Sequence, residues 1–146
     1  YHNGIGVTKD PAEAVRWYRM AAEQGNAAAQ YNLGVCYHNG IGVTKDPAEA
    51  VRWYRMAAEQ GHAAAQYNLG WRYQNGDGVT KDPAEAVRWY RKAAEQGHAF
   101  AQYILGMCYA NGDGVTKDPA EAVRWVRMAA EQGFFLAKHD LERLES

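Results

Sequence analysis

Residues 1–25 read YHNGIGVTKDPAEAVRWYRMAAEQG, and residues 37–61 repeat this string letter for letter. Two further copies, residues 73–97 and 109–133, differ from it at only a few positions. The copies begin 36 residues apart, so the chain is a tandem repeat with that period. Such near-identity is typical of recent tandem duplication or of a designed consensus sequence, and both origins predict the same architecture.

Each copy carries the start and stop signals of a helix, which we call helix B. In the second copy Asp46 can cap the N-terminus, Pro47 suits the first helical position, and Glu49 completes a capping box. The glycine at position 61 follows the last turn, where a left-handed residue is favoured. The pattern predicts a helix over residues 47–60 whose buried side carries Ala50, Trp53, Tyr54, Ala57 and Ala58.

A second helix, helix A, is predicted over residues 27–39. Leu33 and Tyr37 lie on its apolar side together with Gly34, which allows a neighbouring helix to approach closely. The glycine-rich turn from Asn39 joins it to the next helix B. In later copies this turn reads NGDGVTKD and resembles an acidic calcium loop, but the full ligand pattern and the closing Glu are missing. We therefore expect an ordinary polar turn.

Two helices per repeat predict an all-α fold, an α/α solenoid of 36-residue helix-turn-helix repeats in which each unit packs on its neighbours. The recurring tryptophans, one in each helix B, are expected in the core. The chain from 1 to 146 is expected to be one domain. Its predicted parts are helix B of a partial first repeat (11–24), three repeats (27–61, 63–97 and 99–133) and a C-terminal capping helix over about 134–146.

Composition and charge exclude several function classes. The formal net charge is −1 and the basic residues are spread through the repeats, which argues against a nucleic-acid partner. No run approaches the roughly 18 apolar residues of a membrane span. Because Tyr1 matches Tyr37 near the end of a helix, the chain opens inside a repeat and resembles a fragment. The compartment is therefore unassigned.

The sequence offers no catalytic constellation, so we predict neither an enzyme nor a cofactor. The only serine is Ser146, at the terminus. Equivalent positions in a solenoid lie at least one helix spacing apart, about 8–10 Å, which is too far for a shared zinc ion or a disulfide. This argument applies to the cysteines Cys36 and Cys108, predicted to be small, partly buried residues, and to the histidines, predicted to be exposed at helix ends: His2, His38, His62 and His98.

The chain resembles the Sel1-like repeat proteins, relatives of the tetratricopeptide repeats. The matching residues form A-x-x-x-L-G-x-x-Y-x-x-G-x-G-V from Ala29 to Val43 and D-x-x-x-A-x-x-W-x-x-x-A-A-x-x-G from Asp46 to Gly61. The resemblance implies a right-handed superhelix whose A helices line a concave groove that holds partner proteins or peptides. Cysteine-rich relatives carry a disulfide in every repeat, and this chain lacks those cysteines.

Helix B hardly changes between copies, whereas helix A changes at particular positions. Val35 becomes Trp71 and then Met107, and the alanine at position 28 becomes Phe100. With the recurring tyrosines these positions span an arc of about 80° opposite the side that faces helix B. We predict that nine residues, named here the groove set, contact a partner: Tyr31, Val35, His38, Tyr67, Trp71, Gln74, Phe100, Tyr103 and Met107. The alternative is that Trp71 and Phe100 only fill space between A helices.

Two other functions stay open at this point. Nearly identical repeats present similar interfaces at both ends of the array, so copies of the chain could stack end to end as a homo-oligomer. The chain could equally be a spacer or docking module inside a larger protein.

Overall fold

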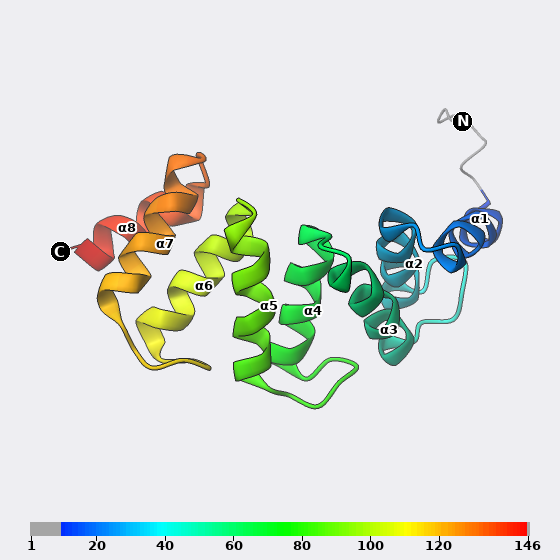
Figure 1. Ribbon diagram of the computed structural model, residues 1–146, viewed down its shortest axis with the longest axis horizontal. Coiled ribbons are helices and arrows are strands. Elements are labelled where there is room, and N and C mark those ends of the chain that lie inside the picture. Colours follow the sequence, from blue (N-terminus) through cyan, green and yellow to red (C-terminus); the bar gives the residue numbers. More distant parts are fainter. Residues whose placement is uncertain (1–9, 146) are drawn as a thin grey trace.

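The computed structural model describes residues 10–145. Tyr1, His2 and Ser146 lie outside the described residues. Within this part of the chain the helices follow one another along the long axis of the molecule, and its two ends lie far apart (Figure 1). The predicted all-α repeat fold is confirmed by eight helices: α1 (Pro11–Glu23), α2 (Ala27–Asn39), α3 (Pro47–Glu59), α4 (Ala63–Asn75), α5 (Pro83–Glu95), α6 (Ala99–Asn111), α7 (Pro119–Glu131) and α8 (Phe135–Glu145).

The B helices, α1, α3, α5 and α7, begin as the sequence predicts. The carboxylate of Asp46 accepts a hydrogen bond from the Glu49 N–H at 3.2 Å, and Pro47 occupies the first turn. Asp10, Asp82 and Asp118 cap the other B helices in the same way. Gln60 is the C-cap of α3, so this helix ends one residue before the predicted boundary.

Glycines in the A helices allow close packing against the following B helix. A Cβ atom on Gly34 would lie 2.8 Å from Cδ1 of Tyr54, and one on Gly106 would lie 2.5 Å from Cγ2 of Val126. Real Cβ atoms do not approach carbon atoms this closely. These positions therefore require glycine, and the leucines one residue earlier, Leu33 and Leu105, are fully buried beside them.

A ladder of buried glutamines joins consecutive repeats. Gln66 is 4% exposed and donates from Nε2 to the Ala58 carbonyl at 3.1 Å. Its Oε1 accepts from Gln96 of the next repeat at 2.8 Å. The same pair of bonds forms at Gln30 and at Gln102. Each of these glutamines therefore satisfies a carbonyl at the end of one B helix and fixes the position of the next B helix.

The tryptophans depart from the prediction at one end. Trp53, Trp89 and Trp125 are 4–5% exposed, but Trp17 is 59% exposed. Trp53 packs in a cluster with Val15 of α1 and Leu33 of α2, that is, on the preceding pair of helices. Among residues 10–145 no helix pair precedes α1, so Trp17 has no such neighbour. The prediction of a buried tryptophan in every copy is wrong for Trp17.

The last helix, α8, differs from the other A helices. Glu142 replaces the packing glycine and Glu145 replaces the tyrosine, and both side chains are exposed. Phe135 and Leu136 are also exposed, so the outer surface of α8 is charged but not uniformly polar. That α8 caps the array stays a prediction. No helix in the described part of the chain combines the length and the apolar content that a membrane crossing requires.

Candidate functional site

The structure distributes the groove set over three A helices, with three members each on α2, α4 and α6. Two of its members are exposed large side chains, Trp71 at 38% and Phe100 at 50%. The other seven are partly buried. Every member therefore keeps some accessible surface, and the two bulkiest variable residues keep the most.

Ring contacts join part of the groove set into a continuous row. Tyr67 lies four residues before Trp71 on α4, so both rings are on one side of that helix. The Tyr67 ring centroid is 5.9 Å from that of Phe100 on α6. Phe134 then lies 4.5 Å from Phe100 and 5.3 Å from Tyr103. The aromatic row therefore runs from α4 across α6 to the start of α8.

Phe134 was missed by the sequence analysis. It stands immediately before α8, at the repeat position held by Asn26, His62 and His98 in the other copies. That substitution of a polar residue by an aromatic one was a visible signal. The substitution could be linked to the groove set only from the structure, in which Phe134 contacts Phe100.

Tyr103 and Met107 are held partly by the fold itself. Both pack against a cluster centred on Val126 and Ala137 of α7 and α8. The Tyr103 hydroxyl donates a hydrogen bond to the Asp140 carboxylate, and burial with this neighbouring acid raises the pKa of Tyr103 to about 12. Tyr103 and Met107 therefore fill space between helices, whereas Trp71 and Phe100, for which the sequence left that alternative open, are exposed.

A buried arginine lies beneath Trp71. Arg72 is 5% exposed, and its guanidinium carbon lies 4.6 Å from the Trp71 ring centroid. Nη1 donates to Asp77 Oδ2 at 2.6 Å and lies 3.2 Å from Nδ1 of His38 on α2. Nη2 donates to Asn68 at 3.3 Å. The arginine stands where the other copies have Cys36 and Cys108, and these bonds hold its guanidinium against the Trp71 ring.

The two polar members of the groove set already have partners within the chain. His38 lies against Arg72, and burial together with that cation lowers the pKa of His38. Gln74 donates to Asp113 at 3.2 Å and accepts from the Tyr90 hydroxyl at 2.6 Å. Their polar groups therefore hold neighbouring A helices in place, which leaves the exposed aromatic rings as the free part of the set.

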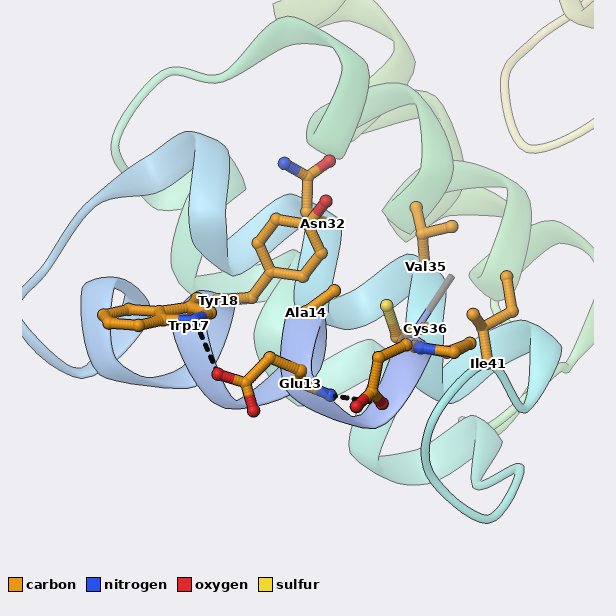
Figure 2. A pocket seen from close by; sticks show the side chains of 10 residues that line it. Glu13, Ala14, Trp17, Tyr18, Asn32, Val35, Cys36 and Ile41 are labelled. Carbon is orange, nitrogen blue, oxygen red and sulfur yellow. Dashed lines mark hydrogen bonds between the residues drawn. The ribbon is translucent and has the colours of Figure 1, made fainter. Parts of the chain in front are cut away.

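A pocket lies at the other end of the array, between α1 and α2 (Figure 2). Its volume is about 580 Å³. Trp17 stands at its edge and donates from Nε1 to Glu13 at 3.0 Å. Apolar groups form most of the wall, including Ala14, Tyr18, Val35 and Ile41. Figure 2 also shows the Cys36 thiol beside Val35, and burial raises the pKa of this thiol, which keeps it protonated.

The described residues contain no metal-binding cluster of three or more His, Cys, Asp or Glu side chains. Cys36 and Cys108 are both free and buried. Burial raises the pKa of Cys108 to about 12, so its thiol is protonated at neutral pH and is a weak nucleophile.

A family model described as the Sel1 repeat matches residues 1–26, 27–62, 63–98 and 99–134. These four segments cover almost the whole chain. The chain belongs to the Sel1 repeat family. Sel1 repeat proteins are generally non-catalytic scaffolds, and the fold implies a role in protein interaction.

Solved structures of Sel1 repeat proteins superimpose closely on this one. A Sel1 repeat protein from Oxalobacter formigenes shares 47% identity at a TM-score of 0.87, over 91% of this chain and 55% of that one. The protein c5321, a protective antigen of uropathogenic Escherichia coli strains with an SLR fold, shares 47% identity at a TM-score of 0.92. That match covers 95% of this chain and 30% of the antigen.

A more distant similarity is to cysteine-rich protein B of Helicobacter pylori. It has 26% identity and a TM-score of 0.72, over 95% of this chain and 100% of that one. A comparison with curated proteins finds no match. This Sel1 repeat chain thus spans about half or less of the length of the first two solved relatives.

Proposed function

We propose that this Sel1 repeat chain binds a segment of a partner protein along the A helices, with Trp71 and Phe100 as the principal contacts. The observation that carries the proposal is that two large aromatic residues, which replace Val35 and Ala28 of the repeat 27–61, are 38% and 50% exposed although most other positions hardly change between repeats. Exposed aromatic surface of this kind is typical of interaction sites. Aromatic side chains also dominate binding hot spots.

The rigidity of the surrounding residues favours the same proposal. Arg72, held by Asp77 and Asn68, packs over the Trp71 ring, and Phe134 packs edge-on against Phe100. Side chains that are already ordered lose less conformational entropy when a partner binds. The aromatic row is therefore suited to bind a partner without first rearranging.

Hydroxyl-radical footprinting tests the proposal, since it labels exposed aromatic side chains. A partner recovered by affinity capture with this chain as bait should protect Trp71 and Phe100 from labelling. Trp17, which is exposed at 59% but lies in the end pocket, is the internal control and should be labelled equally with and without partner. Unchanged labelling of Trp71 and Phe100 in the complex would reject the proposal.

End-to-end assembly is the second candidate function, and the pocket at α1 favours it. The repeat position of Trp17 is buried in α3, α5 and α7, where it packs on a preceding repeat. A second copy of the chain that covers Trp17 and Ile41 would bury the tryptophan as a preceding repeat does in α3, α5 and α7. Light scattering should then show a mass that rises with concentration and returns to that of a monomer in a Trp17→Lys, Ile41→Lys variant. A monomeric wild-type chain throughout would exclude this mode.

A further inference from the structure

Two A helices are capped by histidine rather than by an ordinary capping residue. His62 Nδ1 accepts a hydrogen bond from the Ala65 N–H at 3.1 Å, at the start of α4. His98 makes the same bond to the Ala101 N–H at 3.1 Å, at the start of α6. Both residues lie at helix ends as predicted, but their side chains are half-buried, so the expectation that they are exposed is wrong.

Each of these histidines also joins its helix to the preceding A helix. The His62 ring stacks on Tyr31 of α2 with centroids 5.0 Å apart, and the His98 ring stacks on Tyr67 of α4 at 5.2 Å. One neutral imidazole therefore performs two tasks at each junction. It satisfies the first turn of its own helix and packs against the helix before it.

The other two copies provide a comparison within the chain. Asn26 caps α2 with the same geometry, accepting from the Ala29 N–H at 2.8 Å through an amide that does not titrate. Phe134 occupies the position before α8 and packs on Phe100 and Tyr103. Only the two interior junctions, α2 to α4 and α4 to α6, depend on a titratable group at this position.

Protonation would remove the cap. A neutral imidazole has one acceptor nitrogen, whereas an imidazolium has none, so protonated His62 would direct an N–H at the Ala65 N–H. The positive charge would also lie at the positive end of the helix dipole. Attraction between the cation and the tyrosine ring opposes these effects. The lost cap, the repulsion by the helix dipole and the partial burial of the charge together outweigh the attraction to the tyrosine ring.

The electrostatic surroundings agree with this balance. Burial lowers the pKa of both His62 and His98 below the ordinary histidine value of about 6.5. The groups that face them across the junctions are Tyr31 and Tyr67, and no described charged side chain contributes to either shift. His38, near the opposite end of α2, differs because it faces Arg72, Asp77 and Lys45.

We propose that His62 and His98 form an acid-sensitive device that loosens the A helices of the interior repeats when the pH falls through the range between neutral and mildly acidic. The unfolded chain binds protons at these positions before the folded chain does. Stability from the caps is therefore fully present above about pH 6.5 and is lost as the pH decreases toward the folded-state pKa values. The inference does not depend on partner binding.

Thermal unfolding of the full chain at pH 7.5 and pH 5.5 tests the device. We expect the wild-type Tm to fall by roughly 5 °C or more between these values. A His62→Asn, His98→Asn variant, which copies the cap of α2, should lose less than half as much. Because each variant is compared with itself at two pH values, a general loss of stability does not affect the result. An equal fall in both proteins would overturn the proposal.

A His38→Gln variant separates the caps from the remaining histidine contact, since Gln74 stands at that position in the next copy. Because the pKa of His38 is also lowered, this variant should lose a minor part of the wild-type dependence on pH and keep most of it. A flat response would assign the effect to His38 and overturn the proposal. Amide hydrogen exchange gives a local readout. At pH 5.5 the Ala65 and Ala101 amides should lose protection relative to Ala29, and an unchanged ratio would contradict the device.

Discussion

At the residue scale, Gly34 and Gly70 set the distance between each A helix and the B helix that follows it. A Cβ atom at Gly70 would lie 2.9 Å from the Tyr90 ring and 3.1 Å from the Ala86 carbonyl oxygen. The first neighbour is a buried aromatic ring and the second is backbone, so neither can move freely. The requirement for glycine is therefore steric rather than conformational.

A Gly34→Leu, Gly70→Leu variant should consequently be destabilised. Overpacking a dense interior typically costs about 1–3 kcal/mol per site, and the better helix propensity of leucine returns only part of this. Urea unfolding measures the change. The matched control is Ala28→Leu, an exposed position of the same helix, which should change stability by no more than about 0.5 kcal/mol. Equal stability of the glycine variant and the wild type would contradict the packing argument.

Arg72 and Asp77 form an ion pair at two repeat positions that are apolar in another repeat. The repeat 27–61 has Cys36 and Ile41 at these positions. An Asp77→Ile substitution leaves a buried guanidinium without its carboxylate and should cost about 2 kcal/mol, less than the 3–5 kcal/mol of a fully buried pair because the Asp77 side chain is 30% exposed.

Introducing both residues of the repeat 27–61, the cysteine and the isoleucine, should recover most of that stability. An Arg72→Cys, Asp77→Ile variant has no unpaired charge, so chemical denaturation should place it closer to the wild type than Asp77→Ile alone. If the Arg72→Cys, Asp77→Ile variant is less stable than Asp77→Ile, the loss in Asp77→Ile does not come from an unpaired Arg72 charge.

At the element scale, the glutamine ladder holds consecutive B helices together. Gln66→Leu keeps the side-chain size but removes two hydrogen bonds, the one to the Ala58 carbonyl and the one from the Gln96 amide. Those groups keep only their contacts with the Gly61 N–H and the Lys92 carbonyl. The expected loss is about 1–3 kcal/mol in the free energy of unfolding. Gln24→Leu, at an exposed position of the first repeat, is the control and should have almost no effect. A similar result for both variants would mean that the ladder contributes nothing measurable.

Helix boundaries could be predicted from the sequence because their causes are local. Asp46, Pro47 and Glu49 lie next to one another, and their capping geometry needs no knowledge of the rest of the fold. The histidine caps could not be predicted in this way, since the role of His62 depends on the protonation state that its stacking on Tyr31 and its burial produce.

At the scale of the whole molecule, the departures from prediction concentrate at the ends and between repeats. Trp17 is exposed because burial of this position requires a preceding repeat, a fact about the array and not about the residue. The contact of Tyr103 with Asp140 joins residues of different repeats. A period in the sequence predicts that repeats stack, but it does not state which variable side chains remain open after stacking.

The central claim is that the variable aromatic residues of α4 and α6 bind the partner. Titration of a captured partner against a Trp71→Val, Phe100→Ala variant tests this most directly, because the repeat 27–61 already has Val35 and Ala28 at these positions. We predict a loss of affinity of about 30-fold or more, equivalent to about 2 kcal/mol. Thermal stability should fall only slightly, through the lost ring contacts of Phe100 with Tyr67 and Phe134. Wild-type affinity in this variant would contradict the account.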